Sequence, residues 1–295
     1  MKPLRLPSGE SVSTPALTGR AVGWQASSVT ASYEHLLVER PVDGVVLATL
    51  NRPARRNALS REMFDSLSAL QSDVDGDRSA RVLVLTGAGP GFCAGLDLDI
   101  AAELPAMPAD EFYLLQQSWA AAIVGFTQLR TPVIAAVNGA AAGAGFGLAL
   151  AADIRLCSPA ARFNAAFVRI GLSAGDVGCS WALPRIVGLG RAMDILLTGR
   201  FVDAEEAARI GLVSEVVQDD ELLDRTLSVA TAITANSPLG VQLSKEVVTA
   251  NVDAPSLAAA VELENRSQVL ASRSPDMVEA LAAFREKRPP VYGAR

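Results

Sequence analysis

Short apolar runs alternate with amphipathic stretches along the middle of the chain. The runs with the length and composition of strands lie at residues 36–39, 45–50, 82–85, 133–137 and 154–157. The first two flank Arg40-Pro-Val-Asp-Gly44, whose Asp and Gly favour a tight turn, so this pair predicts a β-hairpin. Apolar residues at helical spacing predict helices at 61–72 with Ser60 as N-cap, at 110–128 and at 144–151. The repetition of strand and helix predicts an α/β core.

The two ends of the chain differ from this middle part. Residues 1–30 are rich in Ser, Thr, Pro and Gly, which predicts a flexible N-terminal extension. Beyond residue 237 no strand-like run remains, and amphipathic patterns predict helices at 239–249, 256–271 and 275–287. The sequence therefore predicts three parts: the extension 1–30, a core over 31–236, and a helical region over 237–295.

Composition and charge exclude several classes of protein. The chain has 295 residues, of which 50% are hydrophobic, so it can bury a large core. The net charge is −6 and there is no run of basic residues, which argues against nucleic acid as a partner. No apolar run reaches the roughly 20 residues of a membrane span, so we expect no insertion into a membrane.

Cysteine and histidine usage narrows the chemistry further. Cys93, Cys157 and Cys179 are odd in number and lack the spacing of metal ligands, so the sequence predicts no metal site and a reducing compartment, the cytoplasm. The single histidine, His35, lies in the alternating stretch 33–39, which predicts a surface position on a strand. Serine or cysteine nucleophiles activated by histidine are therefore disfavoured.

Two glycine-rich turns carry the strongest signal for chemistry. Residues 86–97 and 137–147 each follow an apolar run, and each pattern predicts a strand, an exposed turn and the start of a helix. Such turns can aim free backbone N–H groups at one acceptor. An alternative interpretation of Gly87-Ala-Gly-Pro-Gly91 is a dinucleotide-binding fingerprint. Pro90 within the turn, Phe92 at the sixth position and the lack of an acid-terminated strand at the expected interval argue against it.

The order of four motifs identifies a family. They are Asn51-Arg-Pro-Ala-Arg-Arg-Asn-Ala-Leu59, Phe92-Cys-Ala-Gly-Leu-Asp97, the turn 136–147, and Phe284-Arg-Glu-Lys-Arg288. From about residue 33 to residue 288 the chain resembles the crotonase superfamily, the enoyl-CoA hydratase/isomerase enzymes that act on acyl-CoA thioesters. The strand and helix pattern alone fits a doubly wound sheet or a spiral of ββα units, and the resemblance implies the spiral. It also implies a C-terminal helical region used for assembly into trimers or dimers of trimers.

The resemblance also implies which residues bind the substrate. The two oxyanion amides fall on the backbone of Leu96 and Ala144, and the second could slip by one residue to Gly143. Preorganised N–H donors of this kind stabilise the enolate or tetrahedral oxygen of a thioester. No cofactor is implied beyond the coenzyme A of the substrate, and the residues expected around it are Arg55, Arg56, Ala58, Ala94, Leu96, Asp97, Leu98 and Lys287. Asp97 is also expected to cap the helix that follows it, and residues 106–119 are expected to line or cover the acyl pocket.

The chain departs from the family at the residues that move protons. Hydratases of the family carry two glutamates, and the matching positions here are Gly147 and Phe167. The nearest replacement is Asp176, where dienoyl-CoA isomerases of the superfamily carry an acid. Asp176 could instead cap the next helix. Three hypotheses stay open: an enoyl-CoA hydratase of fatty-acid metabolism, an enoyl- or dienoyl-CoA isomerase using Asp176, and a non-catalytic acyl-CoA-binding protein.

Overall fold

The structure is a computed structural model that describes residues 33–293. The predicted extension 1–30 lies outside the described residues. Within the described range no helix combines the length and the apolar character needed to cross a membrane. The three cysteines are free and buried.

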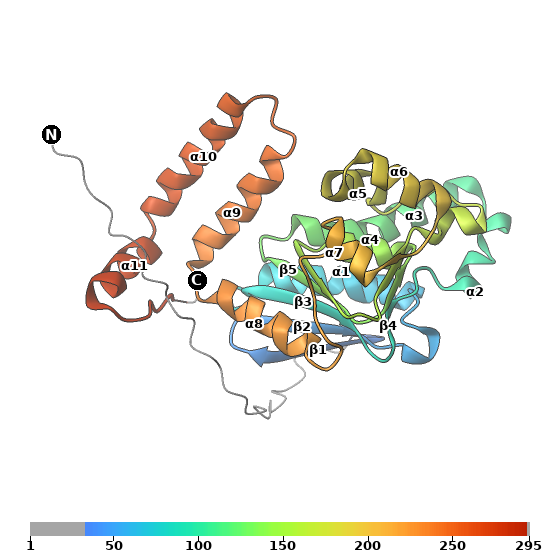
Figure 1. The fold of residues 1–295 in the computed structure, drawn as a ribbon, viewed down its shortest axis with the longest axis horizontal. Coiled ribbons are helices and arrows are strands. Elements are labelled where there is room, and N and C mark those ends of the chain that lie inside the picture. Colours follow the sequence, from blue (N-terminus) through green and yellow to red (C-terminus); the bar gives the residue numbers. More distant parts are fainter. Residues whose placement is uncertain (1–32, 294–295) are drawn as a thin grey trace.

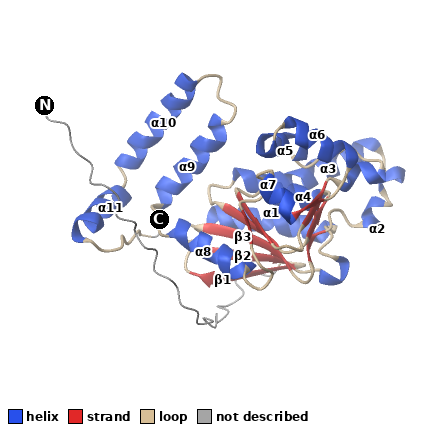
Figure 2. Ribbon diagram, viewed as in Figure 1, coloured by secondary structure: helices blue, strands red, loops and turns tan. Residues whose placement is uncertain are grey.

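Two sheets form the centre of the molecule (Figure 2). The six-stranded sheet has the order β1 (Leu36–Val42), β2 (Val45–Leu50), β3 (Val82–Gly87), β5 (Val133–Val137), β7 (Ile154–Cys157), β10 (Glu215–Val216). Strands β1 and β2 pair antiparallel, which confirms the predicted hairpin, and the other pairs are parallel. The four-stranded sheet has the order β4 (Gly91–Cys93), β6 (Ala140–Ala142), β8 (Arg162–Asn164), β9 (Val202–Asp203).

The chain passes repeatedly from one sheet to the other. Strands β3, β5 and β7 lie in the larger sheet, and each is followed by a short strand of the smaller sheet, β4, β6 and β8. A helix then closes each unit: α3 (Ala109–Val124), α4 (Ala144–Leu150) and α5 (Cys179–Val187). This is the spiral of ββα units rather than a doubly wound sheet, as the resemblance implied. The short strands β4, β6 and β8 were not predicted, because three residues are too few to show a period of two.

The larger sheet is buried on both faces, which explains its continuous apolar runs. One set of alternating residues, including Val46, Leu83 and Ala135, faces the main core between the sheets and helices. The other set, including Val45, Val82 and Ile134, packs against α8 (Leu222–Thr234) on the outer face. The glycine turns at the ends of β3 and β5 are therefore held on a rigid scaffold.

The first helix, α1 (Arg61–Gly76), begins where the sequence predicted. Ser60 Oγ accepts a hydrogen bond from the Met63 N–H at 3.3 Å, which confirms the cap. The predicted end before Asp73 is wrong by four residues, because Leu70 and Val74 continue one buried stripe past that point. The remaining helices of the core are short: α2 (Leu98–Ala101), α6 (Leu189–Thr198) and α7 (Ala204–Arg209).

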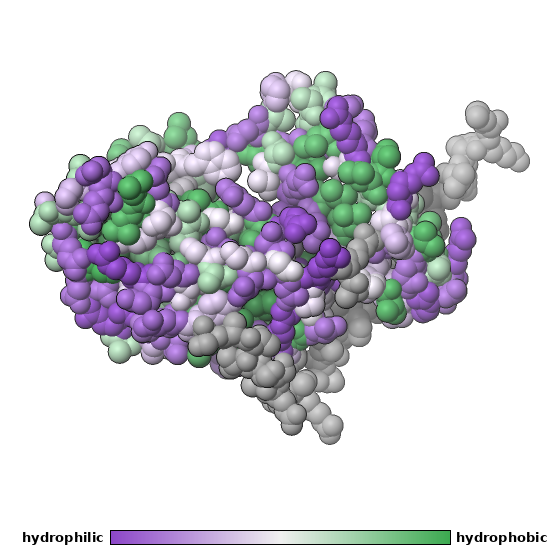
Figure 3. All heavy atoms as spheres, turned by 180° about the vertical axis from the view of Figure 1, so that it is seen from behind, coloured by the Kyte–Doolittle hydropathy of each residue, from purple (hydrophilic) through white to green (hydrophobic). Residues whose placement is uncertain are grey.

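The last three helices form an arm that projects from the core (Figure 1). They are α9 (Pro238–Asn251), α10 (Leu257–Ser272) and α11 (Pro275–Glu286), close to the predicted ranges, with Ser237, Ser256 and Ser274 as their N-caps. Helix α10 buries none of its residues. Hydrophobic side chains gather on the outside of the arm, at the right in Figure 3. The arm thus exposes apolar surface that a monomer would normally cover.

Candidate active site

The two glycine turns meet beside a cavity of about 120 Å³. Its walls are mostly apolar and include the side chains of Phe64, Phe112, Trp119 and Phe167. Phe64 and Trp119 stack with ring centroids 5.1 Å apart. Within the described part of the chain, Asp176 supplies the one titratable side chain of the lining. Such an apolar pocket with few polar groups is the usual form of a small-molecule site.

Close backbone contacts at two glycines, Gly95 and Gly145, hold the two turns together. Gly95 has φ +88°, and a Cβ there would lie 2.6 Å from the Ala142 carbonyl oxygen and 3.2 Å from the Ala144 nitrogen. A Cβ on Gly145 would lie 2.2 Å from the carbonyl oxygen of Cys93. Both distances to oxygen are too short for any side chain. The sequence F-C-A-G-L-D therefore needs its glycine, because the backbones of the two turns touch.

Two backbone N–H groups at this junction are left without a partner. Among the described residues, neither the N–H of Leu96 nor that of Ala144 donates a hydrogen bond, and both residues line the cavity. The N–H of Gly143, in contrast, donates to the Asn164 carbonyl oxygen at 3.0 Å. Of the two candidates on the second turn, Ala144 is thus the residue with a free N–H. Unpaired N–H groups in an apolar pocket are suited to an oxyanion.

The segment after β2 fixes the first turn in place. Leu59 donates its N–H to the Gly95 carbonyl at 2.8 Å, and Asp97 donates to the Leu59 carbonyl at 3.0 Å. The fully buried Asn57 side chain donates to the carbonyls of Ala88 and Gly91 at 2.9 and 2.8 Å. These contacts explain the spacing of the N-R-P-x-x-x-N-A-L motif. The turn that follows β3 leads into strand β4 rather than a helix, which excludes the dinucleotide fingerprint.

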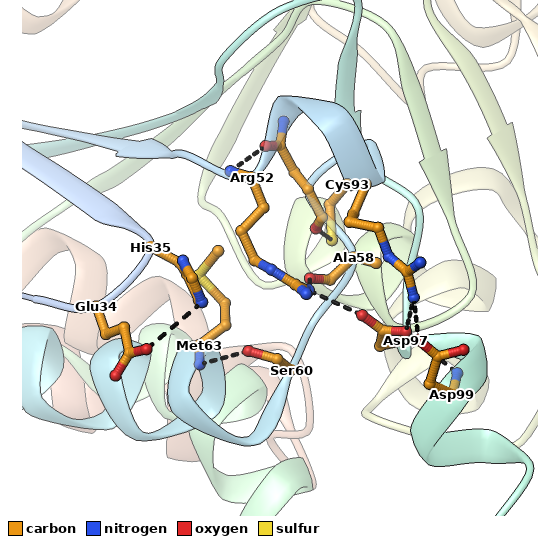
Figure 4. A network of polar contacts seen from close by, with 11 residues as sticks. Glu34, His35, Arg52, Ala58, Ser60, Met63, Cys93, Asp97 and Asp99 are labelled. Atoms are coloured by element: carbon orange, nitrogen blue, oxygen red, sulfur yellow. Dashed lines mark hydrogen bonds and ion pairs between the residues drawn. The ribbon is translucent and has the colours of Figure 1, made fainter.

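The buried carboxylate of Asp97 joins this segment to α2 through a charge network (Figure 4). Its carboxylate accepts hydrogen bonds from Arg52 at 2.9 Å and Arg55 at 2.8 Å. It also caps α2, accepting from the Asp99 N–H at 3.1 Å, as the sequence predicted. Burial would raise the pKa of Asp97, but the bonds from Arg55, from the Asp99 N–H and from Arg52 outweigh it and hold the pKa below the usual range.

The other residues expected around coenzyme A fall into two groups. Ala94, Leu96 and Leu98 line the cavity, and Leu98 is 69% exposed at its rim. Arg55, Arg56 and Ala58 lie on the neighbouring segment, and the Arg55 side chain is 49% exposed although it pairs with Asp97 and Asp99. Lys287 follows α11 in the arm, on the opposite side of the molecule from α2 in Figure 1. In a single chain Lys287 is therefore not brought to the cavity.

Asp176 lies in the cavity wall and does not cap a helix. The N-cap of α5 is Gly178, so the capping interpretation is wrong. Instead, Asp176 Oδ1 accepts hydrogen bonds from Gln116 Nε2 at 2.5 Å and from the Val177 N–H at 2.8 Å. Burial raises the pKa of this carboxyl, and the bonds from Val177 and Gln116 offset only part of that effect. A carboxyl with a raised pKa in an apolar pocket is suited to proton transfer.

Neither position matched to the glutamates of hydratases holds a carboxyl here. A Cβ on Gly147 would lie 2.4 Å from Val177 Cγ2, so a longer side chain would displace the loop that carries Asp176. Val177 has φ +39°, an unusual conformation for a branched residue. The other position, Phe167, places its ring in the cavity wall. The absence of a side chain at Gly147 is what allows the Asp176 loop to approach.

Several residues considered from the sequence lie elsewhere. His35 is half-buried in a turn before β1, with φ +63°, so its assignment to a strand is wrong. Burial raises the pKa of all three cysteine thiols to about 12, which removes them as nucleophiles at neutral pH. Of residues 112–119, Phe112, Gln116 and Trp119 line the cavity, whereas Tyr113 and Leu114 are exposed. Gln116 was not identified from the sequence. Helical spacing places it on the same face as Phe112 and Trp119, but it does not show which residue that face contacts.

Comparison with known proteins identifies the family of the chain. The sequence profile of the family described as Enoyl-CoA hydratase/isomerase matches residues 41–295. A probable enoyl-CoA hydratase of Mycobacterium leprae is 42% identical over 267 residues, which cover 87% of this chain and 89% of the relative. The 1,2-epoxyphenylacetyl-CoA isomerase of Escherichia coli (strain K12) is 38% identical over 250 residues, 84% of this chain and 95% of the relative.

Solved structures show the same fold. An enoyl-CoA hydratase from Bacillus anthracis superposes with a TM-score of 0.84 at 32% identity, over 89% of this chain and all of that one. A match of this length in both sequence and fold is not explained by single motifs. The chain is an enzyme of the enoyl-CoA hydratase/isomerase family, the crotonase superfamily.

Proposed function

We propose that this enzyme is an enoyl-CoA isomerase that moves a carbon–carbon double bond with one carboxyl group. The thioester oxygen accepts hydrogen bonds from the backbone N–H groups of Leu96 and Ala144. Asp176 carries the proton. The observation that supports this assignment is that Asp176 is the single titratable side chain among the described residues that line the cavity.

The reaction needs one proton acceptor that later acts as donor. With a 3-enoyl-CoA, the Asp176 carboxylate takes a proton from the carbon next to the thioester, and the electron pair of that C–H bond moves into the thioester. The resulting dienolate oxygen is held by the two N–H groups. Asp176 then returns the proton to the fourth carbon, so the double bond ends beside the thioester. Proton and charge balance without a second side chain.

Hydration is the second candidate, and the printed name of the Mycobacterium leprae relative favours it. It requires a positioned water as well as a proton for the neighbouring carbon. The positions matched to the two hydratase glutamates hold Gly147 and Phe167. Asp176 would have to do both tasks. The name of the Escherichia coli relative, an isomerase, favours the one-carboxyl reaction instead.

The binding of coenzyme A would use the charged segment beside the first turn. Arg55 and Arg56 follow the turn at Arg52 and remain exposed. Guanidinium groups bind phosphate oxygens well. Because Arg55 also pairs with Asp97 and Asp99, binding a phosphate would exchange one anionic partner for another. The reaction would then need no cofactor besides the coenzyme A that the substrate carries.

Product analysis separates the candidate functions. Purified protein is incubated with short- and medium-chain trans-3-enoyl-CoA and, separately, trans-2-enoyl-CoA. We expect the 3-enoyl substrate to gain the absorbance of a conjugated thioester at unchanged mass. A product that gains the mass of one water would favour hydration. Saturable binding with no product from either substrate would contradict both reactions and favour a binding protein.

The arm is proposed to join this chain to further copies as a trimer or a dimer of trimers. Leu270, Val278 and Phe284 are 61%, 70% and 82% exposed on α10 and α11. Covering such side chains is the usual driving force of association. Light scattering should give a mass three or six times that of the 30.8 kDa chain. Phe284→Glu should lower it, and a monomeric wild type would contradict the proposal. Assembly would also let Lys287 reach a neighbour's cavity.

A further inference from the structure

We infer that Gln116 is a positioning residue for Asp176, and that it assigns Oδ2 as the oxygen that exchanges the proton. The inference rests on the proposed function and adds a residue to it. Gln116 lies on α3, far from Asp176 in the sequence, and it is the one side chain of the described residues that hydrogen-bonds this carboxyl.

The two donors to Asp176 meet the same oxygen. Gln116 Nε2 donates to Oδ1 at 2.5 Å and the Val177 N–H donates to Oδ1 at 2.8 Å. One donor comes from α3 and the other from the loop before α5, so the carboxyl plane is fixed from two sides. An oxygen that already accepts two hydrogen bonds is a poor site for a proton.

The second oxygen, Oδ2, accepts no hydrogen bond from the described residues. Within the described range, Asn164 Oδ1 is the one fully buried side-chain nitrogen or oxygen atom that lacks a hydrogen bond. Asp176 Oδ2 also accepts no hydrogen bond from the described residues, so it is not fully enclosed. Asp176 itself lines the cavity, and we therefore assign Oδ2 to the side that a substrate would occupy.

Few other charges surround this carboxyl, so a change at Gln116 would act on it directly. On α5, the buried Cys179 thiol has its pKa raised to about 12, by burial first and then by Asp176, and stays neutral. On α3, Tyr113 is 64% exposed. Arg169, before the Asp176 loop, stacks over Phe201 at 5.5 Å. Helix α4 carries no ionisable side chain.

Gln116 stabilises the charged form of Asp176, because its N–H donor binds a carboxylate better than a carboxylic acid. Its loss should therefore raise the pKa of Asp176. Gln116→Met keeps the length of the side chain and removes the donor. We expect the acidic limb of the pH–rate profile to move upward by about one pH unit. Turnover should fall on the acidic side of the profile and recover at higher pH, and KM should stay nearly unchanged.

Gln117→Met is the matched control, since Gln117 is the next residue on α3 and is exposed. Its profile should equal that of the wild type. A purely structural role for Gln116 would lower turnover equally at all pH values, and superimposable profiles would overturn the inference. The carboxyl ¹³C resonance of Asp176, assigned by its loss in Asp176→Asn, gives a readout without turnover. If Asp176→Asn stays fully active, the proposed function fails, whereas an unshifted ¹³C titration in Gln116→Met contradicts the role of Gln116 alone.

Discussion

Replacing Asp176 by Asn should lower isomerase turnover on the order of 10³-fold, the loss typical of a missing acid–base group. The amide keeps the size of the carboxyl but cannot accept the proton. Binding of the acyl-CoA should persist, because the Leu96 and Ala144 N–H groups are untouched. Steady-state kinetics and calorimetric titration of a saturated acyl-CoA measure the two effects separately.

The pH dependence gives a second check on the same carboxyl. Burial raises the pKa of Asp176, and the bonds from Val177 and Gln116 only partly offset this. Since the carboxylate is the active form in the first step, wild-type turnover should fall as the pH is lowered through that raised pKa, earlier than for an exposed aspartate. Asp220→Asn, at an exposed loop position, is the control and should leave turnover and its pH profile unchanged. Full activity of Asp176→Asn would remove Asp176 from the mechanism.

Gly95→Ala should lower turnover on the order of 10²-fold by displacing the two N–H groups from each other. The added Cβ would meet the Ala142 carbonyl oxygen at 2.6 Å and the Ala144 nitrogen at 3.2 Å. The φ of +88° adds strain for any side chain, of about 1 kcal/mol. The Leu96 N–H follows Gly95 directly, so the same change moves both donors. They would then no longer meet at the thioester oxygen. Kinetics and thermal unfolding should be measured together.

Gly190→Ala is the matched control for that substitution. Gly190 lies in α6, and a Cβ there would meet no atom within 4 Å. The change should leave turnover intact and slightly stabilise the helix. If Gly95→Ala lost stability but kept wild-type turnover, the contact between the turns would be structural and the oxyanion role of Leu96 and Ala144 would be in doubt.

Part of the site could be predicted from the sequence because its chemistry lies in the backbone. The glycine turns after two apolar runs indicated free N–H groups, and the family motifs assigned them to Leu96 and Ala144. Pattern could not choose between Ala144 and Gly143, which differ only in whether the N–H is already paired. The Asn164 carbonyl decides that, and it comes from β8, the strand that pairs with β6 in the smaller sheet. Likewise, Asp176 was identified but its capping role was wrong.

The sequence by itself determined the order of the longer strands and helices and the glycine-rich turns where backbone N–H groups are available. These follow from local periodicity and from glycine's freedom at positive φ. The tertiary structure decided what meets those elements: Gly95 against Ala142, Val177 against Gly147, and Gln116 against Asp176. Contacts between residues far apart in the chain leave no periodic signal, because each partner alone fits many neighbours. The packing of the spiral decides which of these neighbours each residue contacts.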